Sequence, residues 1–361
     1  MKHSPLDAAH RALGAKMVPF GGWEMPLSYA GGTLAEHHAC RTACVAFDVS
    51  HLGTVEVTGP GRRSSANGER SAFESLQANL TNDLRKIGPG RAQYTHLLDD
   101  VDASVLDDII VWWTADDVFH VMPNASNTER VVAAIGGTDI TPTRAVIAVQ
   151  GPTARSTAAE VVGSVATDVP RFGVQRFDWR DGTTVTVAGT GYTGEDGVEF
   201  AVPAGDAATD LWQALLATGV APAGLGARDL LRLEAGLPLH GHELGPGITP
   251  LQAGLGWVVG WDKGDFRGRN ALEKERAEGP ARRLRGIVVD GRQPPRDGYA
   301  VSIGGEVVGS VTSGNFSPVL GKGIAMTFLP PDVQLGTAVE VDLRGKPAPG
   351  TVVKLPFIAK D

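Results

Sequence analysis

Residues 189–199 combine the residue types best suited to chemistry: four glycines, one tyrosine and three carboxylates, in the order GTGYTGEDGVE. The first six match G-x-G-x-x-G, a pattern that binds the pyrophosphate of a dinucleotide. That pattern works only where a strand leads into a helix whose N-terminus faces the phosphate. Here residues 183–188 and 198–202 both alternate like strands, and turn residues lie between them. The sequence therefore favours a tight loop between two strands, able to approach a flat polar ligand closely.

Two adjacent carboxylates, Asp107 and Asp108, stand near the start of an apolar segment, residues 105–111, that predicts a strand. Successive side chains of a strand point to opposite faces of its sheet. One carboxylate can therefore face a cavity while the other faces solvent or closes a turn. An equally good interpretation of these residues alone is that they close the loop that begins at Asp99.

Charged residues alternate along residues 226–236, where the pattern predicts a helix. A functional role for Arg228 and a solvated, salt-bridged helix face built from Asp229 and Arg232 fit this pattern equally well.

Histidines and cysteines cluster in residues 37–44 and 240–243. Neither spacing fits a familiar zinc pattern. No G-x-S-x-G motif is present, and neither Cys40 nor Cys44 stands in a context that marks an activated nucleophile. We therefore expect neither a bound metal nor covalent catalysis.

The composition is that of an ordinary globular chain of 361 residues, with 42% apolar and 20% charged residues. The net charge of −8 argues against a general nucleic-acid binder. No run of about 18 apolar residues predicts a membrane span, and the N-terminus lacks the apolar stretch of a secretory signal. Two cysteines at i,i+4 spacing suggest free thiols in a reducing compartment, so we expect a cytoplasmic protein.

The elements that must position these residues follow from periodicity and turn residues. Helices are predicted over residues 33–42, 64–78, 126–135 and 207–217, and strands over residues 54–58, 92–98, 108–113 and 118–122. Residues 273–285 are typical of a charged linker. Six short strands follow it, with a two-residue hairpin at Gly304 and Gly305, and their spacing favours a small β-barrel or jelly roll. The fold class is therefore α+β, with a C-terminal β domain.

A series of motifs runs along nearly the whole chain. They are FGGWEMP (20–26), EHH (36–38) with RT (41–42), FDVSH (47–51), LTND (80–83), LDDIIV (106–111), VQGP (149–152), GTGYTGE (189–195), GLGARD (224–229) with LRLEAG (231–236), and TSG (312–314) with FSP (316–318). In this order they resemble aminomethyltransferase, the T-protein of the glycine cleavage system.

The resemblance implies a three-domain cloverleaf around a central channel that holds tetrahydrofolate. Its domains would be a folate-binding α+β domain of residues 1–50 with 137–272, an inserted α+β domain of residues 51–136, and a C-terminal β-barrel domain of residues 273–361. The implied reaction passes the one-carbon unit of an aminomethyl group, carried on the lipoyl arm of an H-protein, to tetrahydrofolate. Ammonia and the dihydrolipoyl arm are released.

The resemblance also implies roles for single residues. Asp107, the first aspartate of the pair, is expected beside the reacting nitrogens of the folate, while Asp108 closes a turn. Glu199 would accept hydrogen bonds from the pterin edge. Arg228 matches a ligand-contacting arginine, and Tyr94 and Tyr192 match aromatic residues of the ligand pocket.

The implied co-substrate is tetrahydrofolate, with no metal, nicotinamide or flavin. The implied partner is the lipoylated H-protein, with no nucleic acid and no membrane. Two alternatives stay open: a folate-dependent demethylase of a small methylated compound on the same fold, and a folate-binding non-transferase protein. The second would carry a Lys-Gly-Cys-Tyr motif at residues 189–194, where this chain has no cysteine. The chain also has Ala103 and Ser104 where the family has two glycines, and it lacks a C-terminal tyrosine found in some relatives.

Overall fold

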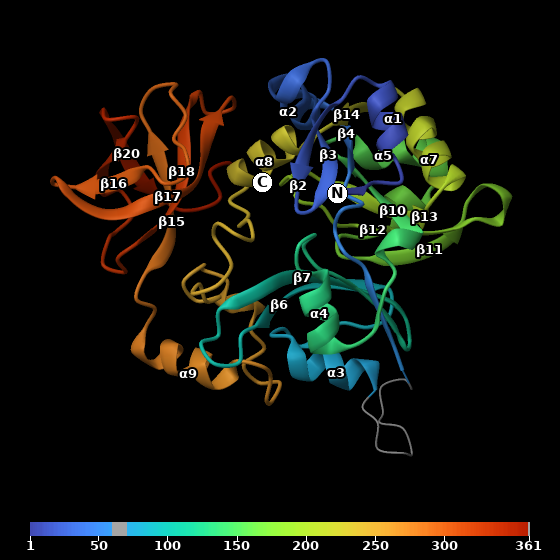
Figure 1. Cartoon of the computed structure of the whole chain (residues 1–361), viewed down its shortest axis with the longest axis horizontal. Helices are drawn as coiled ribbons and strands as arrows, with labels where there is room; N and C mark the ends of the chain where they lie inside the picture. Colours follow the sequence, from blue (N-terminus) through green and yellow to red (C-terminus); the bar gives the residue numbers. More distant parts are fainter. Residues whose placement is uncertain (60–70, 360–361) are drawn as a thin grey trace. The chain divides into compact units, whose positions relative to one another are not determined.

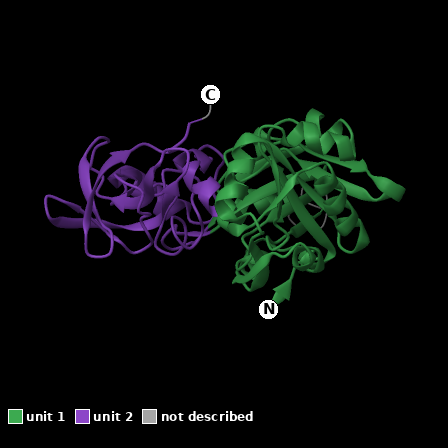
Figure 2. Ribbon diagram, turned by 90° about the horizontal axis from the view of Figure 1, so that it is seen from above, with its two compact units in different colours: residues 1–97, 107–228 green, residues 98–106, 229–361 purple. Residues whose placement is uncertain are grey.

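The computed structural model of the chain describes residues 1–59 and 71–359 (Figure 1). The chain divides into two units (Figure 2). Unit 1 comprises Met1–Leu97 and Asp107–Arg228, and unit 2 comprises Leu98–Leu106 and Asp229–Asp361. Unit 1 mixes helices with sheets and unit 2 contains a barrel, which confirms the α+β class. The division into three domains, with boundaries after residues 50, 136 and 272, stays a prediction.

The main sheet of unit 1 has six strands in the order β11-β12-β13-β10-β4-β14. Neighbouring strands are antiparallel except β4 and β14, which are parallel. The strands are β4 (Val45–Asp48), β10 (Arg144–Gln150), β11 (Val174–Asp178), β12 (Thr184–Ala188), β13 (Gly197–Pro203) and β14 (Ala221–Ala223). Strands β12 and β13 confirm the two alternating segments predicted on either side of the glycine-rich loop.

Helices α5 (Ala154–Val162) and α7 (Asp206–Ala217) pack on β10 and β13 and on each other (Figure 1). The apolar core at this contact includes Phe200 and Trp212, which are both 0% exposed. Burying one large apolar side chain stabilises a fold by roughly 1.5–3 kcal/mol. This core fixes β13, the strand that carries Glu199.

A three-stranded sheet in the order β1-β3-β2 completes the N-terminal part of unit 1. Its strands are β1 (Lys2–His3), β2 (Lys16–Phe20) and β3 (Trp23–Ser28), and the helices α1 (Asp7–Ala12) and α2 (Gly32–Thr42) belong to the same stretch of chain. Helix α6 (Val165–Asp168), further along the chain, packs on α5. Helix α2 confirms the helix predicted over residues 33–42. The buried carboxylate of Asp48 accepts a hydrogen bond from the Ser4 hydroxyl and lies 2.8 Å from His10 Nε2, which joins this part to β4.

A second sheet has five strands in the order β6-β7-β8-β5-β9. They are β5 (Val55–Thr58), β6 (Arg91–Leu98), β7 (Val105–Ala115), β8 (Val118–Met122) and β9 (Thr138–Asp139). Helices α3 (Ala72–Asn79) and α4 (Thr128–Ile135) pack against each other, and α4 also packs on β5 and β9. Helix α3 confirms the later part of the helix predicted over residues 64–78, of which residues 64–70 lie outside the described residues. This sheet carries Tyr94 on β6 and the aspartate pair on β7.

Unit 2 contains a closed barrel of six strands in the order β15-β18-β17-β16-β19-β20. The strands are β15 (Arg283–Val289), β16 (Ala300–Ile303), β17 (Glu306–Ser317), β18 (Lys322–Leu329), β19 (Ala338–Asp342) and β20 (Pro347–Val353). Gly304 and Gly305 connect β16 to β17 with φ values of 58° and 87°, and positive φ at both positions is what a tight hairpin turn requires. The predicted C-terminal β domain and its hairpin are confirmed.

The charged linker predicted over residues 273–285 is wrong. Its first part, residues 273–278, belongs to helix α9 (Arg269–Glu278), and its last part belongs to β15, which begins at Arg283. The sequence ALEKERAE consists of strong helix formers, Leu272 is buried, and Arg269 pairs with Glu273 one turn later at 2.7 Å. Helix α8 (Leu225–Glu234) confirms the helix predicted over residues 226–236. Short 3-10 helices lie at Leu84–Lys86, Thr141–Thr143, Arg180–Gly182 and Gly256–Val258.

The turn after β6 contains Ala103, which has a φ of 58° and is 0% exposed. This is the left-handed region that glycine occupies without strain, whereas another residue pays roughly 1–2 kcal/mol there. The turn thus holds an alanine in a conformation suited to glycine. In residues 1–59 and 71–359, no helix combines the length and the apolar character that a membrane span needs.

Candidate active site

The glycine-rich loop joins β12 to β13, which pair antiparallel, so no helix follows it. The dinucleotide interpretation is therefore excluded at this place, as the sequence predicted. Gly191 packs directly on the side chain of Gln150: a Cβ atom at this glycine would lie 1.9 Å from Gln150 Oε1. That side chain cannot easily move, because it donates to the carbonyl of Thr190 and accepts from the Thr193 hydroxyl. The loop is thus held in one shape at the start of β13.

Glu199 on β13 is buried, with 6% exposure, and its Oε2 accepts a hydrogen bond from the Thr190 hydroxyl at 2.5 Å. Burial raises the pKa of this carboxyl, whereas the Thr190 hydrogen bond and the positive charge of Arg228 oppose the rise. Burial lowers the pKa of the Arg228 guanidinium, and Glu199 and Tyr192 oppose that shift. Glu199 and Arg228 therefore lie close enough to stabilise each other's charges.

The guanidinium carbon of Arg228 lies 4.9 Å from the centre of the Tyr192 ring, within the range of a cation–π interaction. Its Nη1 atom is buried and has no hydrogen-bond partner among the described residues. Native structures leave few buried donors unpaired, because each costs about 1–3 kcal/mol. An unpaired guanidinium nitrogen beside a tyrosine ring is what a site built for a polar ligand would contain.

Asp107 and Asp108 point to opposite faces of β7, as expected, and have different hydrogen-bond partners. Asp107 is 0% exposed and accepts three hydrogen bonds: from Asn124 N at 3.1 Å, from Asn124 Nδ2 at 2.8 Å and from Asn127 Nδ2 at 2.8 Å. Asp108 is part-exposed and accepts from the Tyr94 hydroxyl at 3.1 Å and from Asn124 Nδ2 at 2.7 Å. Asp108 is therefore the aspartate that contacts Tyr94, while Asp107 is bound by Asn124 and Asn127. The role beside the folate that the resemblance implies for Asp107 stays a prediction.

Burial raises the pKa of Asp107 to about 8, with a further contribution from the charge of Asp108. The three hydrogen bonds from Asn124 and Asn127 oppose this rise. Two carboxylates this close resist being ionised together. Asn124 bridges the two carboxylates, since it donates to both, and so relates their positions.

Tyr94 links Asp108 to the glycine-rich loop, residues 189–199. Burial raises the pKa of its hydroxyl well above the ordinary value, with further contributions from Asp108 and then Tyr192. Tyr94 therefore contacts Asp108 and lies near Tyr192. Tyr192 in turn lies against Arg228, and Arg228 lies near Glu199. We call these five residues the Asp108 cluster: Tyr94, Asp108, Tyr192, Glu199 and Arg228. The structure thus brings four of the five predicted site residues together with Asp108. The fifth, Asp107, is also near, since its charge contributes to the raised pKa of Tyr94.

The sequence did not single out Asn124, Asn127, His51 or His96. The two asparagines lie between β8 and α4 in PNASN, a composition equally typical of any loop before a helix. His51 is 3% exposed, and burial, followed by the charge of Arg228, lowers its pKa to about 3. Burial alone lowers the pKa of His96 to about 3. His51 lies within the FDVSH motif, which is the only signal that could have drawn attention to it.

The two buried histidines predict a loss of stability in acid. Each is neutral in the folded chain but protonates near pH 6.5 when unfolded, so the stability it contributes is present above pH 6.5 and is lost as the pH falls toward about 3. The slope is about 1.4 kcal/mol per pH unit for each group. In His51→Gln, which lacks one of the two histidines, the free energy of unfolding should fall less steeply than in the wild type. The difference should be about 1.4 kcal/mol per pH unit between pH 6.5 and 4.5. The exposed His38→Gln is the control, and equal pH slopes in both variants would contradict the prediction.

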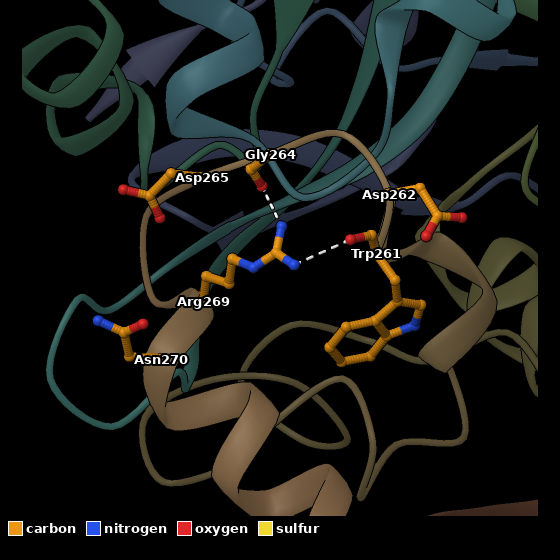
Figure 3. A pocket seen from close by; sticks show the side chains of 6 residues that line it. All are labelled: Trp261, Asp262, Gly264, Asp265, Arg269 and Asn270. Carbon is orange, nitrogen blue, oxygen red and sulfur yellow. Dashed lines mark hydrogen bonds between the residues drawn. The ribbon is translucent and has the colours of Figure 1, made fainter.

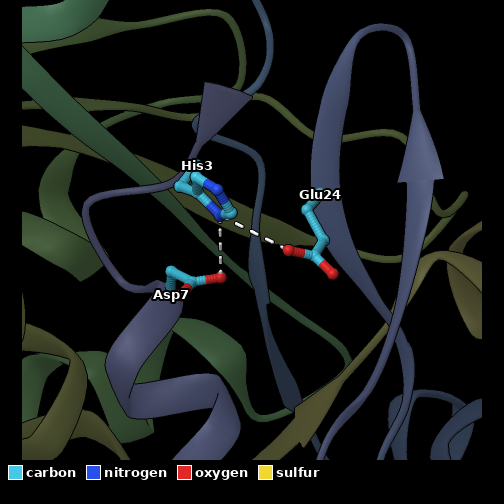
Figure 4. Close-up of side chains that lie close together, drawn as sticks. All are labelled: His3, Asp7 and Glu24. Carbon is cyan, nitrogen blue, oxygen red and sulfur yellow. Dashed lines mark hydrogen bonds and ion pairs between the residues drawn. The ribbon is translucent and has the colours of Figure 1, made fainter. Parts of the chain in front are cut away.

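Neither of the two clusters, residues 37–44 and 240–243, brings three metal-ligand atoms close together. Among the described residues, the one group of three close metal-ligand atoms is His3, Asp7 and Glu24, with His3 Nδ1 at 3.4 and 3.5 Å from the two carboxylates (Figure 4). Arg11 already pairs with both carboxylates, at 2.9 Å to Asp7 and 2.6 Å to Glu24. This group is therefore explained as an ion-pair network at the surface. His240 and His242 contact the backbone carbonyls of residues 106 and 312.

Unit 2 has a hollow of about 490 Å³ lined by Trp261, Asp262, Gly264, Asp265, Arg269 and Asn270 (Figure 3). The Arg269 guanidinium donates to the carbonyls of Gly264 and Trp261. This cation therefore stabilises the loop, and the hollow is not explained as an anion-binding site. In the same unit Arg232, predicted on a solvated helix face, is 2% exposed. It pairs with Asp229 at 2.8 Å, as predicted, and also with the buried Glu243 at 3.1 Å.

The comparisons with known proteins agree along the whole chain. The family model for the GCVT N-terminal domain matches residues 6–263, and that for the glycine cleavage T-protein C-terminal barrel domain matches residues 282–358. The chain is 46% identical to the aminomethyltransferase of Frankia alni, covering 99% of this chain and 98% of the relative. It is also 46% identical to that of Mycobacterium tuberculosis strain H37Rv, covering 99% and 97%.

A solved structure gives the same result. The crystal structure of the glycine cleavage system aminomethyltransferase T from Bartonella henselae matches with a TM-score of 0.90 and 34% identity, covering 99% of this chain and 98% of that one. The chain therefore belongs to the aminomethyltransferase family, the T-proteins of the glycine cleavage system, and it is a transferase of that system.

Proposed function

We propose that the enzyme passes the one-carbon unit of an aminomethyl group, carried on the lipoyl arm of an H-protein, to tetrahydrofolate, and that the folate reacts at the Asp108 cluster. Ammonia and the dihydrolipoyl arm are the other products. The observation that carries this proposal is the buried, unpaired Nη1 of Arg228 beside Tyr192 and Glu199. A flat heteroaromatic ligand with polar edges requires this combination of aromatic surface and a few placed polar groups.

The residues of unit 1 suit tetrahydrofolate in particular. Glu199 is a buried carboxylate whose Thr190 contact occupies only Oε2. A carboxylate can accept two parallel hydrogen bonds, and the pterin edge offers two adjacent N–H donors. Tyr192 offers its ring and Arg228 offers a donor. These groups would bind and orient the folate.

Asp108 is the residue we assign to the reacting end of the folate. It is part-exposed, whereas Asp107 is enclosed and has all its hydrogen bonds made by Asn124 and Asn127. One oxygen of Asp108 is held by Tyr94 and the other by Asn124. A carboxylate fixed in this way can stabilise positive charge on the transferred carbon and take up a proton from the folate nitrogen. Asp107 would then act through Asn124. The role that the sequence predicted for Asp107 is the alternative.

The H-protein partner and the cytoplasmic location are part of the proposal. The family supports the partner, since its members act in the glycine cleavage system. Both cysteines of the chain, Cys40 and Cys44, are buried and neither forms a disulfide, which suits a reducing compartment.

A thermal-shift measurement tests folate binding. Saturating tetrahydrofolate should raise the Tm, because a ligand bound by the native state alone stabilises it by about 2.7 kcal/mol at 100 times its Kd. NAD at the same concentration should leave the Tm unchanged. A shift with NAD and none with tetrahydrofolate would contradict the proposal.

A further inference from the structure

His96 on β6 contacts the hydroxyl of Tyr94, two residues earlier on the same face of the strand. Its Nε2 lies 3.3 Å from the Tyr94 hydroxyl oxygen, and the rings meet edge to face with centroids 5.2 Å apart and an interplanar angle of 86°. The same hydroxyl donates to Asp108 Oδ2 at 3.1 Å. His96, Tyr94 and Asp108 thus form one chain of hydrogen bonds that ends on the carboxylate assigned to the reaction.

The protonation pattern of this chain follows from its contacts. The hydroxyl of Tyr94 has one proton. An ionised Asp108 carboxylate has no proton to donate, so Tyr94 gives its proton to the hydrogen bond with Asp108. The Tyr94 oxygen must then accept the hydrogen bond from His96. The imidazole therefore carries its proton on Nε2. Because burial lowers the pKa of His96 to about 3, the ring is neutral at physiological pH and keeps a single N–H.

The other ring nitrogen shows that packing alone does not explain this histidine. His96 is 0% exposed, and its Nδ1 is buried without a hydrogen-bond partner among the described residues. A buried polar atom left unpaired lowers stability. A leucine would fill similar space without that penalty. A stability cost that persists beside a reacting group is typical of a residue that serves function.

We propose that His96 is a positioning residue for the transfer reaction: its Nε2–H holds the Tyr94 hydroxyl so that the phenol proton points at Asp108. Asn124 holds Oδ1 of that carboxylate at 2.7 Å, and Tyr94, fixed by His96, holds Oδ2. Neutral donors in a connected chain also strengthen one another. The inference deepens the proposed function and rests on the role given there to Asp108.

The test compares His96→Leu, which removes the donor, with His96→Gln, whose amide N–H can replace Nε2–H. Turnover is measured with aminomethyl-loaded H-protein and tetrahydrofolate, and the Tm of each variant is recorded. His96→Leu should lower kcat by about tenfold, the order of one net hydrogen bond, with KM for the folate changed less than about twofold. Its Tm should equal or exceed that of the wild type. His96→Gln should keep kcat within about threefold.

A double-mutant cycle separates positioning from packing. In a Tyr94→Phe background there is no hydroxyl to position, so adding His96→Leu should change kcat by less than about twofold. Trp112→Phe, a buried aromatic change on β7, is the control for packing in the same sheet and should leave kcat unchanged.

Three results would overturn the inference: an equal loss of kcat from His96→Leu with and without the Tyr94 hydroxyl, a folded His96→Gln variant as slow as His96→Leu, or normal kcat in His96→Leu. If His96→Leu does not fold, a folded His96→Gln variant with kcat lowered about tenfold overturns it, and normal kcat in that variant supports it. Asp108→Asn is measured in parallel. Full activity of that variant would reject the proposed role of Asp108, whatever the His96 variants show.

Discussion

Replacing Asp108 with asparagine should lower kcat by at least about a hundredfold, on the scale of lost proton-transfer assistance, while the Kd for tetrahydrofolate changes far less. The amide keeps the shape of the carboxylate but removes its charge, and it can no longer accept both Tyr94 and Asn124 donors in the same way. The kcat is measured by turnover with aminomethyl-loaded H-protein, and the Kd for tetrahydrofolate is measured by titration.

Asp107→Asn is the matched control for this prediction. An amide at position 107 would turn an N–H₂ group toward one of the three donors that Asp107 now accepts, so the variant should lose stability. Its kcat should fall less than that of Asp108→Asn, because Asp107 is enclosed and acts through Asn124. If Asp107→Asn were slow while Asp108→Asn turned over almost normally, the assignment made from the sequence would be correct instead.

Glu199→Gln should raise the Kd for tetrahydrofolate by at least about thirtyfold, the order expected when a buried charged hydrogen bond is lost. The substitution removes the acceptor proposed for the pterin edge and leaves Arg228 without its neighbouring negative charge. The Tm should also fall, because a buried cation that loses its partner is destabilising. Titration of Glu199→Gln and of the wild type with tetrahydrofolate measures the change in Kd, and thermal unfolding measures the change in Tm.

Asp196→Asn provides the control for Glu199→Gln, since Asp196 is an exposed acid in the same loop that pairs only with Arg155 among the described residues. Its folate Kd should stay within about twofold of the wild type, because surface ion pairs contribute little. Equal folate affinity in Glu199→Gln and the wild type would remove Glu199 from the proposed site.

Elements with strong local signals could be predicted from the sequence. Strand β8 begins and ends at the predicted residues, and β12 and β13 lie where alternation placed them. These patterns depend on neighbours along the chain, which the sequence shows directly. Helix α9 does not follow from composition alone, because its charged residues are typical of a linker and are also good helix formers.

The orientation of the aspartate pair could not be predicted in the same way. The period-two alternation of a strand predicts that Asp107 and Asp108 face opposite sides of the sheet. It does not predict which of the two contacts Tyr94. That choice depends on Asn124, from the loop after β8, and on Tyr94, from β6. Both are distant in sequence and become neighbours only when the sheet forms. The burial of Arg232 has a similar origin, since its partner Ser313 lies 81 residues further along the chain.

The most direct test of the central claim is a single-turnover reaction of the enzyme with aminomethyl-loaded H-protein, with and without tetrahydrofolate. We predict that ammonia and 5,10-methylene-tetrahydrofolate form in equal amounts when the folate is present, and that release of ammonia is much slower without it. Turnover of a small methylated compound such as dimethylglycine or dimethylsulfoniopropionate, with loaded H-protein inert, would contradict the account and assign the enzyme to the demethylases of this fold.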